Sequence, residues 1–456
     1  MSNYWRSHNP YFIVAFINGM DLEGITRRLL DSGRDPFNEL PKLISIYRGN
    51  VQGRDPFIEA LVEEVRNSRS SNQFSFSPVG LRAGEAGLGS RGVGDYDVHS
   101  ALLEASGSDP RSFDDAGLAE DVLVSVDGIH SRLSFFPYLA GFHATRAALR
   151  DVMVKGGRPL GVLVDIHLSD DSDVSMLFDF EAGVTTVTDF LKIRILAGST
   201  LRIGGDVVIG ERISGGVGAI AKAPPKPLGR ANVKPGHYVV MTEGHGGGTV
   251  TATAIYHGRP DVVEATINLY DLLSCQLVRD RLLDYVDAMT DVTNGGIRGD
   301  ALEVSRLTST SLVIYPEIFR SLIDPHVLRL MDDVNVDPYG ISIDSIMIFT
   351  KHPDLIIGEL SSRGIKADVV GRVENFIGFP MYVEEDGKLR ELSPNFRESP
   401  YTPVKKVIGN SSKYDRTARN MLISKALAAS LEKKKRFSSL LNSSEVKGRK
   451  DPSNVG

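Results

Sequence analysis

Cysteine is nearly absent from this sequence, and its scarcity excludes several kinds of chemistry. The single thiol, Cys275, rules out an intramolecular disulfide, a thiolate-only metal site and a dithiol redox centre. No apolar run approaches the ~20 residues that a membrane-spanning helix needs. The opening MSNYWRSHNP lacks the basic and apolar regions of a secretory signal. We therefore expect a reducing, cytoplasmic location.

Net charge is also small, but the charges are unevenly distributed. The chain of 456 residues has a formal net charge of −6. From Arg397 to the end, however, 14 Lys and Arg stand against 5 Asp and Glu. Such a basic tail could contact nucleic acid or an acidic partner surface. A solvated helix followed by a disordered end is the interpretation that we favour.

The length exceeds what one hydrophobic core usually organises, so two or more domains are expected. Residues 1–75 predict a helical extension, in which Asp21 caps a helix over LEGITRRLL. Strand and helix patterns alternate over 76–225, and again over 226–395 after the proline-rich PPKPLGR. We predict two α/β domains, followed by a basic helical and disordered tail over 396–456.

Particular elements can be predicted within these domains. AGFHATRAALRDVMVKGG indicates a helix that stops at a glycine pair, and DVLVSVDG and RPLGVLVDIHLS indicate the strands beside it. VTTVTDFLKIRILAGS is expected to be helical, and one long helix is expected near 262–287. MYVEEDGKLRELS predicts a hairpin that turns at Asp386–Gly387.

Acidic residues recur at strand ends and beside small residues, where a charged ligand can approach the backbone. A magnesium–nucleotide complex takes hard oxygen ligands, usually carboxylates. One Asp in such a place is more often an Asx-turn or a cap, but several within a short stretch favour a metal site. The candidate metal ligands are Asp114 and Asp115 in SFDDAG, Asp127 in VSVDGIH, Asp151 in LRDVMVKGG and Asp206 in IGGDVV.

The glycine-rich GEAGLGSRGVGD supplies the complementary half of a nucleotide site. Its backbone N–H groups could converge on phosphate oxygens, and Arg82 and Arg91 would add charge-assisted bonds. A flexible linker would look the same. The segment is not a P-loop, nor the G-x-G-x-x-G fingerprint, and the protein kinase signature set is absent. The predicted nucleotide contacts are Gly87, Gly89, Arg91, Gly92, Asp127, Gly128 and Gly205.

Taken in order, these segments resemble the PurM-like superfamily, which comprises aminoimidazole ribonucleotide synthetase, selenophosphate synthetase, thiamine-monophosphate kinase and the HypE-type hydrogenase maturation protein. FDDAG resembles its GDDAA, and IGGDVV its Gly-Gly-Asp-Thr-Thr. HATRAALRDVMVKGGRPL is similar to the family helix A-x-N-x-S-D-x-x-A-M-G-A-x-P. LGRANVKPGHYVVMTEGHGGG resembles R-S-x-A-K-P-G-D…T-G-x-x-G, and AMTDVTNGGIRGDALEVS resembles D-x-T-x-G-G-L. The resemblance covers about residues 92–375.

This resemblance implies a two-domain α/β fold, in which the first domain's sheet pairs across a homodimer into a barrel. It implies that ATP lies between the domains and that magnesium is held by Asp115, Asp127, Asp151 and Asp206. Asp291 matches a position near the acceptor or a further metal, with Asn294 beside it. His245 could act as a general acid or base, or be a plain hydrogen-bonded histidine. Members transfer the γ-phosphoryl group of ATP by positioning and charge neutralisation, without an obvious nucleophile.

Departures from the family patterns limit the functional prediction. The glycine-rich segment has neither the Cys nor the Lys of selenophosphate synthetases, and the chain ends DPSNVG without the terminal Cys of HypE-type proteins. Arg150 replaces the Ser before Asp151, and Val207–Val208 replace the paired threonines. Arg150 could reach a phosphate, but an ion pair on the helix surface is favoured.

Two functions remain in competition. The first is an ATP- and Mg²⁺-dependent phosphotransferase or ligase that activates a small-molecule acceptor, with Asp291, Asn294 and His245 on the acceptor side. The alternative is a catalytically altered member that binds nucleotide or metabolite and acts through protein partners. Contact of the tail with nucleic acid is the weakest of the ideas, and no membrane partner is expected.

Overall fold

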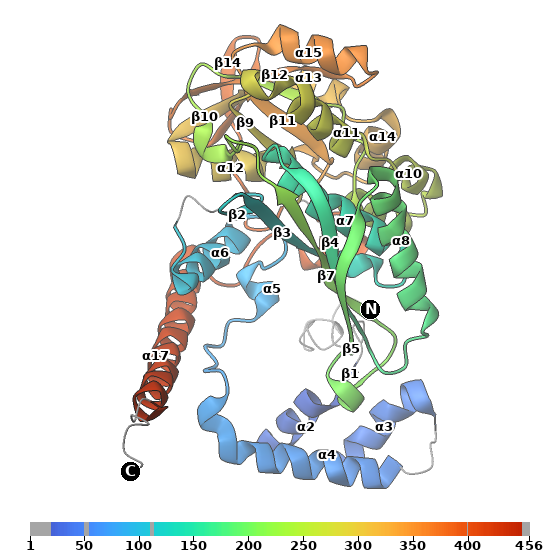
Figure 1. Cartoon of the computed structure of the whole chain (residues 1–456). Coiled ribbons are helices and arrows are strands. Elements are labelled where there is room, and N and C mark those ends of the chain that lie inside the picture. The colour runs from blue at the N-terminus through green and yellow to red at the C-terminus, as the bar shows by residue number, and fades with distance from the viewer. Residues whose placement is uncertain (1–19, 50–53, 110–113, 399, 449–456) are drawn as a thin grey trace, which may run out of the picture.

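The computed structural model describes residues 20–49, 54–109, 114–398 and 400–448 (Figure 1). Two mixed α/β layers, each built on one sheet, form the body of the molecule. A helical extension lies at one end of it, and a long carboxy-terminal helix lies along one side. The mixed α/β class predicted from the sequence is therefore confirmed. In the described part of the chain, no helix is long and apolar enough to cross a membrane.

The first sheet has five strands. Neighbouring strands run antiparallel, except that β4 and β5 run parallel. Its strands alternate buried and exposed residues, so that one face is covered and the other is not. Helices α7 (Pro137–Val154) and α8 (Ser175–Leu191) cover the buried face (Figure 1). In spatial order the strands are β2 (Gly117–Ala119), β3 (Val122–Gly128), β7 (Ile213–Lys222), β4 (Arg158–Leu168) and β5 (Arg194–Arg202).

The second sheet has seven strands, most of them buried on both faces and correspondingly apolar. The predicted hairpin at Asp386–Gly387 is present as its outermost pair. In spatial order the strands are β14 (Lys388–Glu391), β13 (Met381–Glu385), β10 (Thr310–Ile314), β12 (Ala367–Asn375), β8 (Tyr238–Thr242), β11 (Ser345–Thr350) and β9 (Ala288–Val292). The helices that follow its strands are α9 (Gly248–Tyr256), α10 (Pro260–Ala265), α11 (Tyr270–Leu277), α12 (Gly296–Thr308), α13 (Pro316–Ser321), α14 (Pro325–Asp333) and α15 (Pro353–Ser362).

The amino-terminal extension is a small unit with its own apolar core. It consists of α2 (Leu22–Asp31), α3 (Pro36–Arg48) and α4 (Arg54–Ser68), and Asp21 caps α2 by accepting from Gly24 N. Its leading strand β1 (Met20–Asp21) pairs with β6 (Val208–Ile209), at one end of the first sheet. Ile209 belongs to the core of the extension, so the two units share apolar contacts.

Two predicted helices are wrong in part. VTTVTDFL is helical within α8, but RILAGS belongs to the edge strand β5, because α8 ends at Leu191 and the chain reverses through Lys192 in a left-handed conformation. The single helix expected near 262–287 is divided into α10, α11 and two short turns. Thr266 and Asn268 cause the first break, since their side chains donate to the carbonyls of Val263 and Ala265 and so compete with the helical bonds.

The tail is more closely attached than the sequence suggested. It contains α16 (Pro403–Ile408) and α17 (Arg416–Gly448), which lies beside α6 (Val93–Ser106) (Figure 1). Asp97 of α6 accepts from Arg416 at 2.8 Å and from Arg419 at 3.2 Å. The predicted helix is present but docked rather than free in solvent, and the end at 449–456 lies outside the described residues.

Candidate metal and nucleotide site

Helix α7 lies between the two sheets and positions the charged groups of the site. It packs on β3, β4 and β7 of the first sheet, and also on β9 and α11 of the second layer. Small residues at Gly141, Ala144 and Ala148 allow this close approach on several sides. Because its last turns are enclosed by both layers, Arg150 and Asp151 lie where the two layers meet.

Three carboxylates from separate parts of the chain meet beside α7. Asp115 precedes β2, Asp151 ends α7 and Asp291 lies in β9. One oxygen from each lies within 4.8 Å of the other two, close enough for all three to ligate one metal ion. The structure thus brings together two predicted metal ligands and one predicted acceptor-side residue.

Burial and mutual repulsion disfavour the charged forms of these carboxylates. Burial, together with Asp291 and Asp114, raises the pKa of Asp115 to about 7 although Arg230 opposes the shift. Burial and the neighbouring Asp291, Asp127 and Asp115 raise the pKa of Asp151 well above its ordinary value. The pKa of Asp127 is raised as well, chiefly by burial.

Among the three carboxylates, that of Asp151 has the least of its negative charge balanced by cationic side chains of the protein. Asp115 accepts from Arg230 at 2.5 Å, and Asp291 accepts from Arg150 at 2.5 Å. Within the described ranges, the carboxylate of Asp151 makes neither a hydrogen bond nor an ion pair. A carboxylate that faces three others without a cationic partner requires either a proton or a metal ion.

Arg150 is not the surface residue that the sequence favoured. It is 1% exposed. Its guanidinium donates to Asp291, to Asp271 at 2.8 Å and to Asp344 at 2.7 Å. Although burial raises the pKa of Asp344, Arg150 and Arg146 hold that pKa well below its usual range. The surface interpretation failed because Arg150 points away from the first sheet, into the second layer.

A second buried arginine completes the site and was missed from the sequence. Arg230 contacts Asp115 and lies 3.0 Å from Glu303 and 3.7 Å from Asp300. The carboxylates of Asp300 and Glu303 stand on the buried side of α12. Acidic residues three apart within an otherwise apolar helical face were the available signal. Asp114, a predicted metal ligand, is instead paired with Lys155 at 2.5 Å.

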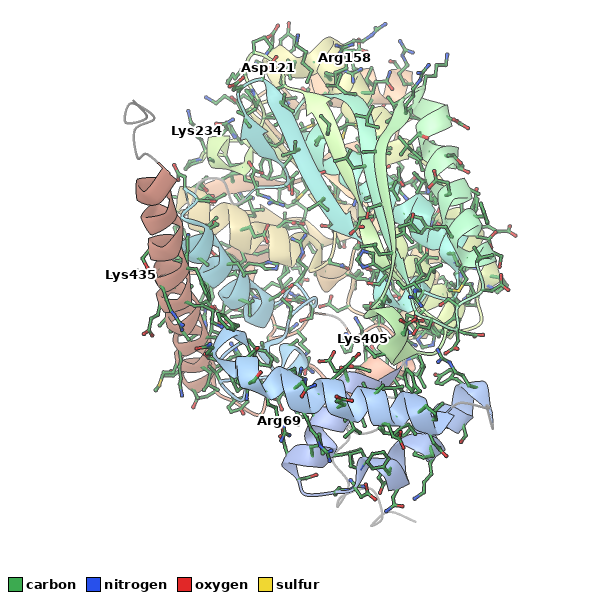
Figure 2. The ribbon with its side chains drawn as sticks, turned by 60° about the horizontal axis from the view of Figure 1, so that its bottom comes forward. Arg69, Asp121, Arg158, Lys234, Lys405 and Lys435 are labelled. Carbon is green, nitrogen blue, oxygen red and sulfur yellow. The ribbon has the colours of Figure 1, made fainter. Side chains whose placement is uncertain are left out.

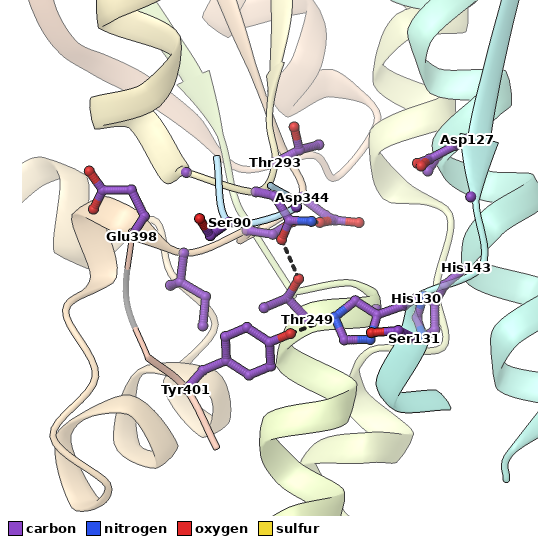
Figure 3. A pocket seen from close by; sticks show the side chains of 18 of the residues that line it. Ser90, Asp127, His130, Ser131, His143, Thr249, Thr293, Asp344, Glu398 and Tyr401 are labelled. Atoms are coloured by element: carbon purple, nitrogen blue, oxygen red, sulfur yellow. Dashed lines mark hydrogen bonds between the residues drawn. The ribbon is translucent and has the colours of Figure 1, made fainter. Parts of the chain in front are cut away.

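A cavity of about 320 Å³ opens beside the carboxylates. Asp127 and Gly128 line it at the end of β3, and Arg150 lines it from α7. Asn294 lines it too, and accepts from Thr249 Oγ1 at 2.5 Å (Figure 3). In the view of Figure 3, Asp127 lies on one side of the cavity, and His130 and Tyr401 lie on another.

The glycine-rich loop is folded onto this cavity. Gly89 and Ser90 line it, and Asp95 fixes the loop by accepting from Gly89 N at 3.1 Å and from Arg91 N at 2.9 Å. Gly92 contacts the backbone of the carboxy-terminal segment so closely that a Cβ there would lie 2.4 Å from the carbonyl oxygen of Phe396. The loop is therefore held in place rather than acting as a linker.

The predicted site residues outside the cavity lining include Gly87, Arg91 and Gly92 of the glycine-rich segment, and also Gly205, Asp206 and His245. Asp206 is 74% exposed and pairs with Arg202 on the turn that leads into β6, and Gly205 is on the same turn. This turn serves the contact with the amino-terminal extension, so within one chain it does not reach the carboxylates. His245 lies 3.3 Å from Glu243 and 3.4 Å from Asp324, and it is not part of the cavity lining.

The donor set fits magnesium and a polyphosphate. All the candidate ligands are hard carboxylate oxygens, and no described group of His, Cys, Asp and Glu other than the Asp115–Asp151–Asp291 triad has metal-binding spacing. Exposed backbone in the glycine loop, at Gly128 and in the 293–295 turn borders the same cavity. Arg150 lines the cavity and supplies positive charge there, whereas Arg91 lies outside the lining, 3.5 Å from Glu303, and opposes the rise in the pKa of Asp127.

Comparison with known proteins agrees with this arrangement. Residues 113–217 match the family described as AIR synthase related protein, N-terminal domain. An uncharacterized protein of Methanocaldococcus jannaschii is 38% identical over 443 residues, which cover 91% of this chain and 97% of that protein. A selenide, water dikinase of Nitrosomonas eutropha is 24% identical over 238 residues, 48% of this chain and 62% of that protein. A thiamine-monophosphate kinase of Methanopyrus kandleri is 25% identical over 213 residues, 45% of this chain and 62% of that protein.

Solved structures share the fold. The structure of a HypE–HypF complex matches with a TM-score of 0.55 at 16% identity, covering 65% of this chain and 99% of that chain. AaThiL complexed with AMPPCP and TMP matches with a TM-score of 0.53 at 18% identity, covering 67% of this chain and 97% of that chain. These likenesses confirm the predicted PurM-like fold. The pairing of two first-domain sheets into a barrel stays a prediction.

Proposed function

We propose that this chain, which belongs to the AIR synthase-related family, transfers the γ-phosphoryl group of ATP to a small-molecule acceptor with the help of Mg²⁺. Relatives named as kinases support ATP-dependent phosphoryl transfer in general terms. The acceptor is left open, because those relatives are named for different acceptors, selenide and thiamine monophosphate.

The observation that carries the proposal is the uncompensated carboxylate of Asp151. It faces Asp115, Asp127 and Asp291 at a point enclosed by both layers. Maintaining such a group in its charged form requires a bound cation, and a magnesium–nucleotide complex brings one. Bound Mg²⁺ would neutralise the phosphate charge that develops during transfer.

The other residues of the site have positioning roles in this proposal. Gly89, Ser90 and Gly128 would border the phosphates, and Arg150 would remain paired with Asp291, Asp271 and Asp344. Asn294, held by Thr249, would face the acceptor. Catalysis would then depend on orientation and charge neutralisation, as expected for a loose phosphoryl transition state.

The test is ADP release from ATP in the presence of Mg²⁺ and a panel of candidate acceptors. Asp151→Asn and Asp127→Asn should lower turnover by about 100-fold or more, because metal stabilisation of the transition state contributes several kcal/mol. Asp121→Asn is the matched control, since Asp121 is exposed at the start of β3 (Figure 2). Turnover that is unchanged in both site variants would contradict the proposal.

A second candidate function rests on the arginines of the site. Arg230 and Arg150 already occupy one oxygen each of Asp115 and Asp291, which leaves fewer free metal ligands than three carboxylates suggest. A member altered in this way would bind nucleotide without transferring phosphate. Isothermal titration that detects ATP binding, with no ADP release for any acceptor, would favour this alternative.

We also propose a homodimer that forms through the uncovered face of the first sheet. Exposed apolar side chains on that face come from β3, β4 and β5, opposite the helices α7 and α8. An apolar sheet face left in water is typical of an interface. The residues are Val124, Val126, Leu160, Leu163, Leu196 and Leu201. A cytoplasmic location remains a prediction.

A further inference from the structure

The segment that follows the second sheet returns to the cavity and closes one side of it. Val93 N and Gly94 N of the glycine-rich segment donate to the carbonyls of Asn395 and Phe396, at 2.9 and 3.2 Å. Glu398 is buried and pairs with Arg298 of α12 at 2.5 Å. These contacts tie the tail to both layers, and they place the residues that follow, Tyr401 and Lys405, in the cavity wall.

Lys405, Tyr401 and His130 form a continuous chain of hydrogen bonds in that wall. Lys405 Nζ donates to Tyr401 Oη at 2.7 Å, and Tyr401 Oη lies 2.9 Å from His130 Nε2 (Figure 3). Burial, with the nearby Lys405 and Arg132, lowers the pKa of His130 to about 3, so the imidazole is neutral. Since the ammonium has only donors, Tyr401 Oη accepts from Lys405, and the direction of its bond with His130 Nε2 is set by the tautomer of the imidazole.

Two buried ring nitrogens at the cavity have no partner. Among the described residues, His130 Nδ1 and His143 Nδ1 make no hydrogen bond. His143 is 5% exposed and lines the cavity, and its Nε2 is used by Thr251 at 2.8 Å. Unpaired buried polar atoms cost stability unless a ligand or water meets them. This end of the cavity is therefore prepared for a polar ligand.

Positive charge collects at the same end without carboxylates to balance it. In the parts of the chain that the structure describes, neither Lys405 nor Arg132 pairs with an acidic side chain. Arg132 instead stacks over Tyr256 at 4.0 Å, with its Nε unbonded. Glu398 also lines the cavity, but it is already paired with Arg298. Figure 2 places Lys405 toward the middle of the molecule, whereas Lys435 lies at its edge on α17.

The cavity thus has two electrically different ends. Asp127 and the carboxylates next to it would take the metal and nucleotide, and the Lys405 end offers an ammonium and unsatisfied polar atoms. We propose that Lys405, Tyr401 and His130 form a subsite that binds an anionic group, a phosphate or carboxylate, of the acceptor. This inference rests on the proposed function, because it takes the bound anion to be part of the acceptor. The binding of an anion at Lys405 can nevertheless be tested without turnover.

The experiment measures reductive methylation of lysines in the full-length protein by peptide mass spectrometry. Lys406 is the internal control, because it is adjacent in the sequence, exposed, and outside the cavity lining. Inorganic phosphate and malonate serve as probes, with EDTA present so that no metal bridges them. Each probe that binds should slow methylation of Lys405 by about tenfold at ten times its Kd, since protection follows 1 + [L]/Kd. The rate at Lys406 should not change.

Further arms separate the sources of the anion. Protection by phosphate alone assigns a phosphate-bearing acceptor, and protection by malonate alone assigns a carboxylate. Equal rates with and without both probes would overturn the subsite. A non-hydrolysable ATP analogue with Mg²⁺ is tested in the same way. If it protects Lys405 and neither probe protects further, the Lys405 ammonium binds the nucleotide, and the acceptor subsite is overturned. Tyr401→Phe should weaken the protection of Lys405 several-fold. If the protein does not turn over ATP, the proposed function fails, but the methylation rates of Lys405 still report whether the anion binds.

Discussion

Arg150 Nε lies 2.5 Å from Asp291 Oδ2, and this bond joins α7 of the first layer to β9 of the second. The same guanidinium also reaches Asp271 and Asp344, so one buried cation holds three carboxylates of the other layer. Neighbouring Asp151 faces Asp291, Asp127 and Asp115, and among the residues that the structure describes no cation forms an ion pair with it. Two consecutive residues therefore have opposite roles: one closes the interface and the other leaves a charge for a ligand.

Replacing Arg150 by Met should destabilise the protein by about 3–5 kcal/mol, because buried carboxylates lose their counter-charge. The free energy of unfolding, measured by urea titration, tests this. Arg158→Met is the control, since Arg158 is exposed at the start of β4 (Figure 2). Equal stability of the two variants would show that Arg150 does not hold the layers together.

Mg²⁺ affinity should rise with pH through about 7, where Asp115 ionises, and the raised pKa of Asp151 adds to this rise. Asp115 has its pKa raised to about 7, so at lower pH a proton must leave before the metal binds. The affinity should fall by about tenfold for each pH unit below this value for one released proton. Calorimetric titrations in buffers of different ionisation enthalpy would count the protons released, and zero release at pH 6 would contradict the assignment.

The metal-free protein should show the opposite trend in stability. The folded-state pKa of Asp115 lies above the ordinary 3.8, so the folded chain binds the proton more tightly than the unfolded chain. This contribution is fully present below about pH 3.8 and is lost as the pH rises through about 7. Thermal unfolding in EDTA between pH 5 and 8 measures it, and added Mg²⁺ should restore stability at the upper end. A profile identical with and without Mg²⁺ would be inconsistent with metal binding at this carboxylate.

Asp206→Asn should leave Mg²⁺ affinity almost unchanged in a chain that acts alone, whereas Asp151→Asn should weaken it strongly. Asp206 is exposed and paired with Arg202, away from the carboxylates. Direct titration of each variant with Mg²⁺ distinguishes the two cases. A comparable loss in both variants would mean that Asp206 reaches the site of another copy across a dimer interface.

Val126→Glu should weaken self-association by placing a charge in the centre of the uncovered sheet face. Val126 is 78% exposed on β3, in the row of apolar residues that we assign to the interface. Sedimentation velocity would report the change in mass. Val174→Glu is the control, because Val174 is also exposed but precedes α8 on the other side of the sheet. A monomer in the unmodified protein would remove the proposal.

Local sequence patterns determined the elements whose signals do not depend on distant residues. The Asp21 cap, the helix that ends at Val154 and the hairpin at Asp386–Gly387 follow from capping, periodicity and turn chemistry. The order of motifs identified the fold, and three of the carboxylates that it named, Asp115, Asp151 and Asp291, do meet. The breaks at Thr266 and Asn268 could not be foreseen, because side-chain bonds there outcompete a helical pattern.

Only the tertiary structure decided the environment of each charged group. Arg150 and Asp206 look alike in sequence, as polar residues in altered motifs, yet one is enclosed by three carboxylates and the other is exposed on a turn. Burial and neighbouring charge set the pKa of a group and the cost of leaving it unpaired, and both depend on residues more than 100 positions away. The approach of Tyr401 and Lys405 to His130 has the same origin, since the sequence around His130 does not indicate that residues about 270 positions later lie beside it.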